Sequence, residues 1–407
     1  MIAATFASCD AFKRDNTRES RTLPENKIIA FSIPGQIGTT VIDETAHTIS
    51  VAMPLGSVLT SLVPTITVSE GAITSPLTGV AHSFTSPATY TVTTNTERDG
   101  TLSQAWVVTV PRVTGQVASF TADSTTFKMM YIPGGIPFPT GWNDLTTPAI
   151  ADSYWMMETE VTWELWDKVR AWAEPEHGYI FANDGVMGGG TGMTMTNQHP
   201  VTTINWRDAM IFSNALTEWY NEKAGTNYTC VYYKIDGTTP IKTSTNNAID
   251  LTLGSEDNPV VKVNSTGFRI PTSKEWEFAA RWRGNDATNT VTGYIEPYFT
   301  QAYSASGATA PADNLVANQA VAWLDPPATG TDRVKGTAIR VPNALGMYDM
   351  SGNVKEWVYN WYSSTEKGAS GGGWGDDGEN TTNASVSTYY PYSKNHLTGL
   401  RLSRRDM

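Results

Sequence analysis

The side chains that could carry soft-metal or nucleophilic chemistry are few in this chain. Its two cysteines, Cys9 and Cys230, lie far apart, which excludes a disulfide framework and a zinc site built from cysteines. The five histidines stand at positions 47, 82, 177, 199 and 396, and none is paired at HxxxH or HxE spacing. No P-loop or HExxH motif occurs. We therefore expect none of the corresponding catalytic activities.

Carboxylates are abundant instead. Pairs such as Glu275 with Glu277 and Asp376 with Asp377 have a spacing that acid–base chemistry could use, but a chain with 40 acidic residues forms such pairs by chance. The net charge of −12 argues against a nucleic acid or an anionic membrane surface as partner, because either needs clustered Lys and Arg. No apolar run approaches the roughly 20 residues of a membrane-spanning helix.

Capping residues and periodicity predict the elements that must position these groups. Thr162, Asn205 and either Thr272 or Ser273 each precede apolar residues at helical spacing, so a helix should begin at each. We expect the Trp and Phe residues of these runs to pack in the core. A strand is predicted over residues 127–132. Between the helices, the aperiodic stretches 179–198, 230–262 and 285–335 should form long loops.

The first 113 residues divide into two parts. Residues 10–25 are polar and charged, and we expect residues 1–25 to form a flexible tether. The stretch Thr5–Cys9 is similar to a bacterial lipobox but lacks a basic segment before it, so lipidation of Cys9 and a plain disordered tail both stay open. Residues 26–113 carry short Val-, Ile- and Thr-rich runs separated by Pro, Gly and Ser, as in a small all-β immunoglobulin-like sandwich. The runs cover residues 28–33, 48–52, 65–68, 89–93 and 105–110.

Residues 114–407 carry a series of motifs that resembles one family. Asn343–Trp357 is similar to the pattern NxxGLYDMxGNVWEW, and Gly267–Phe278 to GFRLPTEAEWE. Further matches are Met129–Gly135, Glu158–Thr162, His199–Ala209, Gly371–Trp374 and Gly399–Arg401. The chain thereby resembles the formylglycine-generating-enzyme-like, or sulfatase-modifying-factor, domain. The resemblance implies an α+β C-type-lectin-like fold, in which long loops on a small sheet present the binding groups.

The resemblance also implies where enzymes of the family keep their chemistry. Their oxidase members bind copper through two cysteines, two and seven residues after the aromatic residue that Trp374 matches. Those positions here are Asp376 and Thr381. Copper(I) selects sulfur ligands, so we expect no copper and no enzyme activity of this kind. The iron-dependent branch carries its metal on a further helical domain with clustered histidines, which this chain does not match.

A calcium site is the one metal site that the resemblance carries over. Family members hold calcium with the Y(N/D)xxGNxxEW motif, which assigns the ligands to the side chains of Asp349 and Glu356 and the backbone carbonyls of Gly352 and Val354. Oxygen ligands suit a structural Ca²⁺ ion rather than a transition metal. The alternative is that the two carboxylates satisfy buried backbone amides near the Gly352 turn.

The segment from about 360 to 398, which would hold the copper cysteines, is rich in Ser, Thr, Asn, Asp, Tyr, Gly and His. This mixture is typical of a paratope, where Tyr supplies stiff contact area and the small polar residues adapt their hydrogen bonds. It also resembles the variable proteins of diversity-generating retroelements, whose adenine-directed mutagenesis yields these residue types. The ligand-binding positions so predicted are Asp376, Asp377, Asn380, Asn383, Ser385, Ser387, Tyr389, Tyr390, Tyr392, Ser393, Asn395, His396 and Thr398.

Our hypothesis is a ligand-binding, receptor- or adhesin-like variable protein displayed on a bacterial surface, as a lipoprotein, or on a phage particle. Its ligand would be a protein or a glycan on another cell or host surface, and the sequence leaves that choice open. Two alternatives remain. The chain is an altered or inactive protein-modifying enzyme of the formylglycine-generating class, or the polar segment is a loop that binds nothing.

Overall fold

The computed structural model describes the chain in two compact units, one ending at Pro111 and the other beginning at Arg112, with residues 54–57 assigned to the second unit. Cys9 and the predicted tether lie outside the described residues. Among the described residues, no helix is both long and apolar enough to cross a membrane. The described residues are 26–36, 39–54, 59–96, 100–113, 117–147, 150, 152–188, 195–245, 247–294, 297–311, 313–323 and 336–406.

The N-terminal unit is built from β-strands, and every run predicted from the sequence forms one. A five-stranded sheet has the order β2-β3-β8-β7-β6, and β1 pairs with β5 in antiparallel fashion. Trp106, Tyr90 and Phe31 are buried between them. The bounds are β1 (Ile28–Ser32), β2 (Val41–Asp43), β3 (Thr48–Ser50), β5 (Thr65–Val68), β6 (Ala72–Ser75), β7 (Ala88–Thr96) and β8 (Gly100–Thr109). The short strands β4 (Met53–Pro54) and β9 (Arg112–Val113) include residues assigned to the second unit.

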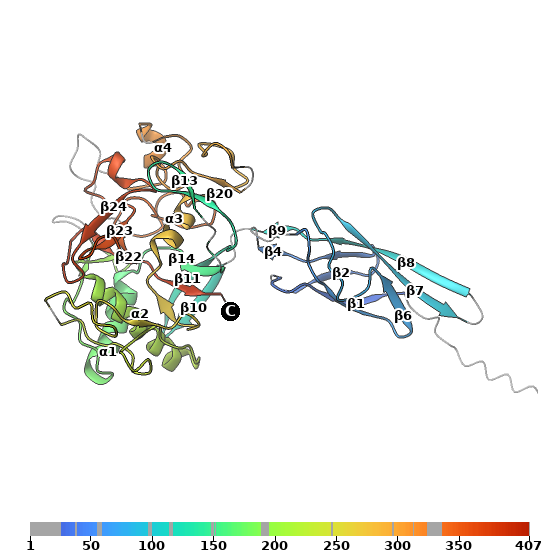
Figure 1. Cartoon of the computed structure of the whole chain (residues 1–407), viewed down its shortest axis with the longest axis horizontal. Helices are drawn as coiled ribbons and strands as arrows, with labels where there is room; N and C mark the ends of the chain where they lie inside the picture. The colour runs from blue at the N-terminus through green and yellow to red at the C-terminus, as the bar shows by residue number, and fades with distance from the viewer. Residues whose placement is uncertain are drawn as a thin grey trace, which may run out of the picture. The chain divides into compact units, whose positions relative to one another are not determined.

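The C-terminal unit is organised around two sheets, both visible in Figure 1. An antiparallel sheet has the order β10-β11-β14-β26-β19, from β10 (Val117–Ala122), β11 (Thr125–Ile132), β14 (Tyr154–Met157), β26 (Ser403–Arg405) and β19 (Phe268–Arg269). The last strand of the chain, β26, thus pairs with β14, which lies near the start of this unit. The second sheet, β24-β23-β22-β25, comprises β22 (Lys355–Trp361), β23 (Lys367–Ser370), β24 (Val386–Tyr389) and β25 (Thr398–Gly399).

Three helices begin where the capping residues predicted. Thr162 caps α1 (Trp163–Glu176), and Asn205 caps α2 (Trp206–Ala224) in a capping box with Asp208. Of the two residues proposed for the third cap, Thr272 is the one used, in a box with Glu275 that starts α3 (Ser273–Arg281). In their described parts, the stretches predicted as loops contain only short elements, which are β15 (Val186–Met187), β17 (Tyr232–Tyr233), β18 (Val260–Val261), β21 (Tyr298–Phe299) and α4 (Leu315–Gln319).

The large aromatic residues form the core, as predicted. Trp166 stacks on Phe212 of α2 with ring centroids 4.7 Å apart. Trp206, Trp276 and Trp357 are also fully buried, and they join the helices to the second sheet. The remaining short elements are β12 (Phe138–Thr140), β13 (Leu145–Thr147), β16 (Val201–Thr202), β20 (Trp282–Gly284) and the 3-10 turn η1 (Gly378–Thr381).

Trp357 should be indispensable to this unit. Truncating a buried Trp costs about 3 to 5 kcal/mol, so Trp357→Ala should lower the free energy of unfolding by that amount in urea titrations. Tyr362 is 64% exposed and serves as the matched control. Tyr362→Ala should change the same quantity by about half a kcal/mol or less. Equal effects of the two substitutions would show that Trp357 does not hold the core.

Candidate functional site

The predicted binding segment is framed by the second sheet. It enters the sheet as β24, which pairs with β23 in antiparallel fashion, and leaves it at β25, which runs parallel to β22. Because side chains alternate along a strand, Lys355, Trp357, Tyr359 and Trp361 share one face of β22. The segment therefore consists of one edge strand and the loops before and after it, with both ends fixed to the sheet.

A buried lysine lies on the face of the sheet that carries these aromatic residues. The Lys367 ammonium lies 3.9 Å from the ring centroid of Trp206 and 4.0 Å from that of Trp361, and it donates a 3.1 Å hydrogen bond to the Tyr359 carbonyl. Burial lowers the pKa of Lys367 to about 7. The ring faces favour the ammonium form, so this residue balances desolvation against cation–π attraction.

A second buried lysine occupies the region where family members bind copper. Lys355 is ion-paired with Asp376 at 2.9 Å, and its ammonium lies 3.5 Å from the Tyr389 hydroxyl. Thr381, at the other cysteine position, is buried and donates to the carbonyls of Asp377 and Gly378. Both positions are thus occupied by polar groups that already have partners.

Three of the thirteen predicted binding positions, Asn383, Ser385 and Thr398, are buried in the structure. The Asn383 side chain donates to the Gln301 carbonyl, and the Ser385 hydroxyl donates a 2.6 Å bond to the Asn380 carbonyl. Thr398 pairs with Lys355 inside the sheet. They contribute to holding the segment in place and offer a ligand little exposed surface. The sequence pattern missed this because small polar residues serve interior hydrogen bonds as readily as surfaces.

The other ten positions are exposed or half-buried, in two groups. Asp376, Asp377 and Asn380 lie on the loop before β24, where Asp377 caps η1 by accepting from the Asn380 amide. On and after β24 the positions are Ser387, Tyr389, Tyr390, Tyr392, Ser393, Asn395 and His396. Tyr389 is only partly free, since its ring packs on Trp357 with centroids 5.7 Å apart.

The turn after β24 presents a stacked pair of tyrosines. The rings of Tyr390 and Tyr392 lie 5.4 Å apart and nearly parallel, with an interplanar angle of 3°. The backbone of the turn is held by the start of α2, because the Trp206 amide donates to the Pro391 carbonyl and the Asn205 side chain donates to that of Tyr392. The pair is therefore fixed to a helix rather than to its own loop.

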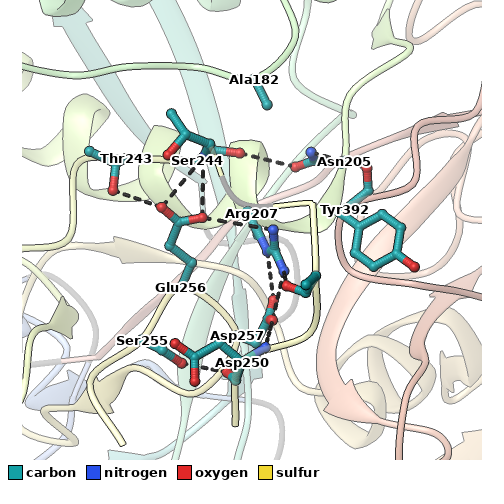
Figure 2. Close-up of polar contacts among 12 residues, drawn as sticks. Ala182, Asn205, Arg207, Thr243, Ser244, Asp250, Ser255, Glu256, Asp257 and Tyr392 are labelled. Carbon is teal, nitrogen blue, oxygen red and sulfur yellow. Dashed lines mark hydrogen bonds and ion pairs between the residues drawn. The ribbon is translucent and has the colours of Figure 1, made fainter. Parts of the chain in front are cut away.

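Arg207 lies beside Tyr392 (Figure 2), and its guanidinium is 5.6 Å from the centre of the tyrosine ring. Arg207 is fully buried and makes two bonds to Asp257, of 2.6 and 2.7 Å, and one to the Ala248 carbonyl. Asp257 also accepts from the Asp250 amide. The long loop around residues 244–258 is thereby joined to α2 and to the candidate surface.

Sequence reasoning missed the basic residues of this site. Lys355 could have been found, because it stands where the GNVWEW pattern of the family has Trp. Arg207 and Lys367 gave no signal, since single basic residues are normally solvated and only their surroundings in the fold make them unusual.

The predicted calcium ligands differ in how many of their oxygen atoms are free to bind a cation. Glu356 accepts bonds of 2.7 to 3.0 Å from Arg401 and one of 2.7 Å from the Trp276 indole, so a calcium ion there would have to displace a guanidinium. Asp349 accepts from the Ala338 amide through one oxygen, and its other oxygen has no hydrogen-bond partner. Within the described ranges, no three His, Cys, Asp or Glu side chains form a metal-binding group. Calcium at these positions stays a prediction.

Glu160 adds to the polar interior beside Asp349. It is buried, and neither of its carboxylate oxygens has a hydrogen-bond partner. Burial raises the pKa of Glu160 well above its usual value, and Asp349 raises it further while Arg401 opposes both. The capacity to accept a cation or a proton therefore lies with Asp349 and Glu160, whereas Glu356 is already engaged.

Comparison with known proteins agrees with this architecture. Residues 115–406 match the family model described as the sulfatase-modifying factor enzyme 1-like domain, and residues 28–110 match the one described as SGBP, N-terminal. The chain is similar to the crystal structure of CarF, with a TM-score of 0.52 and 26% identity over 71% of this chain and 100% of that one. Treponema denticola variable protein 1 has a TM-score of 0.53 and 24% identity, over 71% and 99%.

Chaperone protein LppX of Paenibacillus barcinonensis is 29% identical over 198 residues, which is 46% of this chain and 64% of that protein. The chain thus matches less than two thirds of this curated relative. The comparisons confirm the C-type-lectin-like fold of the formylglycine-generating-enzyme type and a preceding β domain. The immunoglobulin-like classification of that domain stays a prediction.

Stability measurements can distinguish calcium binding at Asp349 from the ion pair between Glu356 and Arg401. If Asp349 holds calcium, a chelator should lower the melting temperature of the parent protein but not of Asp349→Asn. Glu356→Gln should lower the free energy of unfolding by about 3 to 5 kcal/mol with or without chelator, because it leaves the buried charge of Arg401 uncompensated. Asp313→Asn, an exposed substitution, is the control. The same chelator response in the parent and in Asp349→Asn would exclude the site.

Lys367 should give stability a defined pH dependence. Its pKa falls from 10.5 to about 7 on folding, so between these values the unfolded chain binds the extra proton and stability rises with pH. The stability advantage of Lys367→Met over the parent should therefore be greatest at or below pH 7 and shrink toward pH 10 in denaturant titrations. The exposed control Lys394→Met should show no such trend. A constant difference across this range would mean that the aromatic rings keep the ammonium charged.

Proposed function

Because the chain belongs to the family of the sulfatase-modifying factor enzyme 1-like domain, we propose that it is a ligand-binding member of it, a variable protein of a diversity-generating retroelement. Its binding surface would be the exposed part of the segment 376–396, carried on the C-type-lectin-like scaffold. The observation that carries this proposal is the contrast within that segment. Exposed Tyr, Asn, Asp and His side chains stand on a backbone that buried residues fix at many points.

Asp376 and Thr381, which stand where enzymes of the family have copper-binding cysteines, support a binding role over catalysis. Asp376 is held by Lys355 and Thr381 is buried, so neither offers the sulfur that copper(I) requires. The one free cysteine in the described part of the chain is Cys230, which is buried, and burial raises the pKa of its thiol to about 12. A thiol of that kind is a poor nucleophile and a poor metal ligand at neutral pH.

The exposed side chains have the character of a recognition surface. Tyr390 and Tyr392 present two rigid rings, and Asp377, Asn380 and His396 present polar groups beside backbone held by η1 and α2. Rigid aromatic contacts lose little conformational entropy on binding, and small polar groups adapt to different partners. The name of Treponema denticola variable protein 1 suggests variability in a protein of the same fold, and the proposal extends that property to this chain. With Cys9 as a lipid anchor, the surface would face outward from a bacterial cell.

The DNA around the gene tests the proposal. We expect a reverse transcriptase gene nearby and a near-copy of the final part of the coding sequence, with mismatches confined to adenines. The structure sharpens this expectation, since mismatches should fall on codons for exposed positions such as Tyr390, Tyr392 and His396. The codons of the buried Asn383, Ser385 and Thr398 should be spared, because diversity there would disrupt the fold.

Two results would contradict the proposal. One is variation among sequenced isolates that is spread evenly over exposed and buried positions, which would indicate ordinary drift. The other is copper-dependent oxidation of a cysteine-containing peptide by the purified protein above a no-protein control. That activity would favour an altered enzyme of the formylglycine-generating class.

A further inference from the structure

Two exposed aromatic rings outside the C-terminal segment form a pair beside a cavity. Trp142 is 39% exposed and Tyr303 is 53% exposed, and their ring centroids lie 5.0 Å apart at an angle of 44°. Both line a cavity of about 580 Å³, together with Asn380 of the predicted binding segment. We propose that this cavity is a carbohydrate subsite in which the two rings hold a neutral sugar. The inference rests on the proposed function and names its ligand class.

The Trp142 side of the cavity is rigid. Trp142 lies in the turn between β12 and β13, where the Gly141 amide donates a 2.8 Å bond to Glu277 and the Gly141 carbonyl accepts one of 2.8 Å from Arg281. Arg281 is fully buried on α3, and it is ion-paired with Asp144 of the same turn. The turn is thus fastened to a helix, so the exposure of Trp142 does not arise from a loose loop.

The Asp144 side chain also holds the backbone next to Tyr303. The Asp144 carboxylate that pairs with Arg281 also accepts a 3.1 Å bond from the Ala302 amide, the residue before Tyr303. The two rings therefore stand on backbones joined by one side chain. A platform held in this way loses little entropy when a ligand binds.

Asn383 joins this platform to the C-terminal segment. Its amide donates a 3.0 Å bond to the Ser304 carbonyl, and its side chain donates to that of Gln301. Both partners flank Tyr303 in the sequence. Asn383, a buried residue that was predicted to contact the ligand, thus aligns the loop of Asn380 with the aromatic pair. The cavity between this loop and the two rings is therefore bounded by backbone that is held in place on both sides.

The chemistry of the cavity favours a sugar. Aromatic faces carry partial negative charge and attract the polarised C–H bonds of a pyranose ring, while the Asn380 amide and the Asp313 carboxylate offer hydrogen bonds to hydroxyl groups. The residues that line the cavity include no Lys or Arg, which argues for a neutral sugar over an acidic one. Its volume lies in the range of about 300 to 1,000 Å³ typical of small-ligand sites, whereas a protein partner needs about 800 Å² of surface on each side.

Affinity electrophoresis of the full chain provides the test. Native gels would contain soluble neutral polysaccharides, namely glucan, mannan, galactan and xylan in separate gels, with a polyuronate gel for comparison. We expect retardation in at least one neutral gel and none in the polyuronate gel. Trp142→Ala and Tyr303→Ala should each weaken the retardation roughly tenfold or more, as expected for central aromatic contacts. Asn380→Ala should weaken it less.

Matched controls separate binding from folding. Tyr362→Ala removes an exposed aromatic residue that does not line this cavity, and it should leave retardation unchanged. Melting temperatures of all variants should match that of the parent, because the side chains removed are exposed. A variant that melts early is replaced by Trp142→Phe or Tyr303→Phe, which keeps the ring face and should retain most of the retardation.

Three outcomes would overturn the inference. Retardation that survives Trp142→Ala and Tyr303→Ala but is lost in a Tyr390→Ser and Tyr392→Ser double variant would place sugar binding on the C-terminal segment alone. Such a result would leave the proposed function intact. Absence of retardation in every gel would remove the carbohydrate subsite, and the DNA test would still decide the proposed function. Selection from a peptide display library of binders that need Trp142 and Tyr303 would assign the cavity to a protein ligand.

Discussion

The C-terminal unit depends on one buried ion pair, between Arg401 and Glu356, whose side chains are 0% and 1% exposed. Removing two charges from water is costly unless every donor and acceptor finds a partner. Arg401 therefore also donates to the carbonyls of Met157 and Tyr348, and Glu356 also accepts from the Trp276 indole. The pair brings together β14, the loop before β22, β22 itself, α3 and the short segment between β25 and β26 that carries Arg401. These segments are separated by up to 244 residues in the sequence.

This closure explains how a polar segment of low regularity can present a defined surface. The segment begins after β23, pairs with that strand as β24 and ends at β25. Arg401 of the ion pair follows shortly after β25. Between these points Asn383, Ser385 and Thr398 are buried: Asn383 donates to the Gln301 carbonyl, Ser385 donates to the Asn380 carbonyl, and Thr398 lies where β25 pairs with β22. Substitutions at outward positions such as Tyr390 and His396 then change the surface and leave the bonds of Asn383 and Ser385 intact, which is the property that a diversified site requires.

The basic residues inside the unit show how the scaffold adapts to a polar surface. Lys355 replaces a Trp of the family pattern and neutralises Asp376, which replaces a thiol, so the two changes compensate each other's charge. Arg207 is neutralised by Asp257 while its planar face supports Tyr392. Lys367 is surrounded by ring faces instead of carboxylates. Each of these basic side chains lies close to the candidate surface, and its charge is stabilised by a carboxylate or by aromatic rings of the protein. The rest of the surface is therefore free for a ligand.

The sequence by itself indicated the fold class, through the resemblance of its motifs to one family. It also determined the starts of α1, α2 and α3, five strands of the first unit and the burial of most Trp residues in the helical runs. These features follow from local capping groups and from apolar periodicity, which do not depend on distant contacts. The resemblance also indicated a candidate binding segment and the positions, Asp376 and Thr381, where enzymes of the family have copper-binding cysteines, since motif spacing fixes these positions. Only the tertiary structure decided which polar residues of the segment face inward, because Asn383 and Asn380 are chemically alike and differ only in the partners that the fold brings to them. Trp142, Tyr303 and Asn380 come from three distant loops, and no local pattern encodes their meeting, since long-range hydrogen bonds through Asp144 and Asn383 create it.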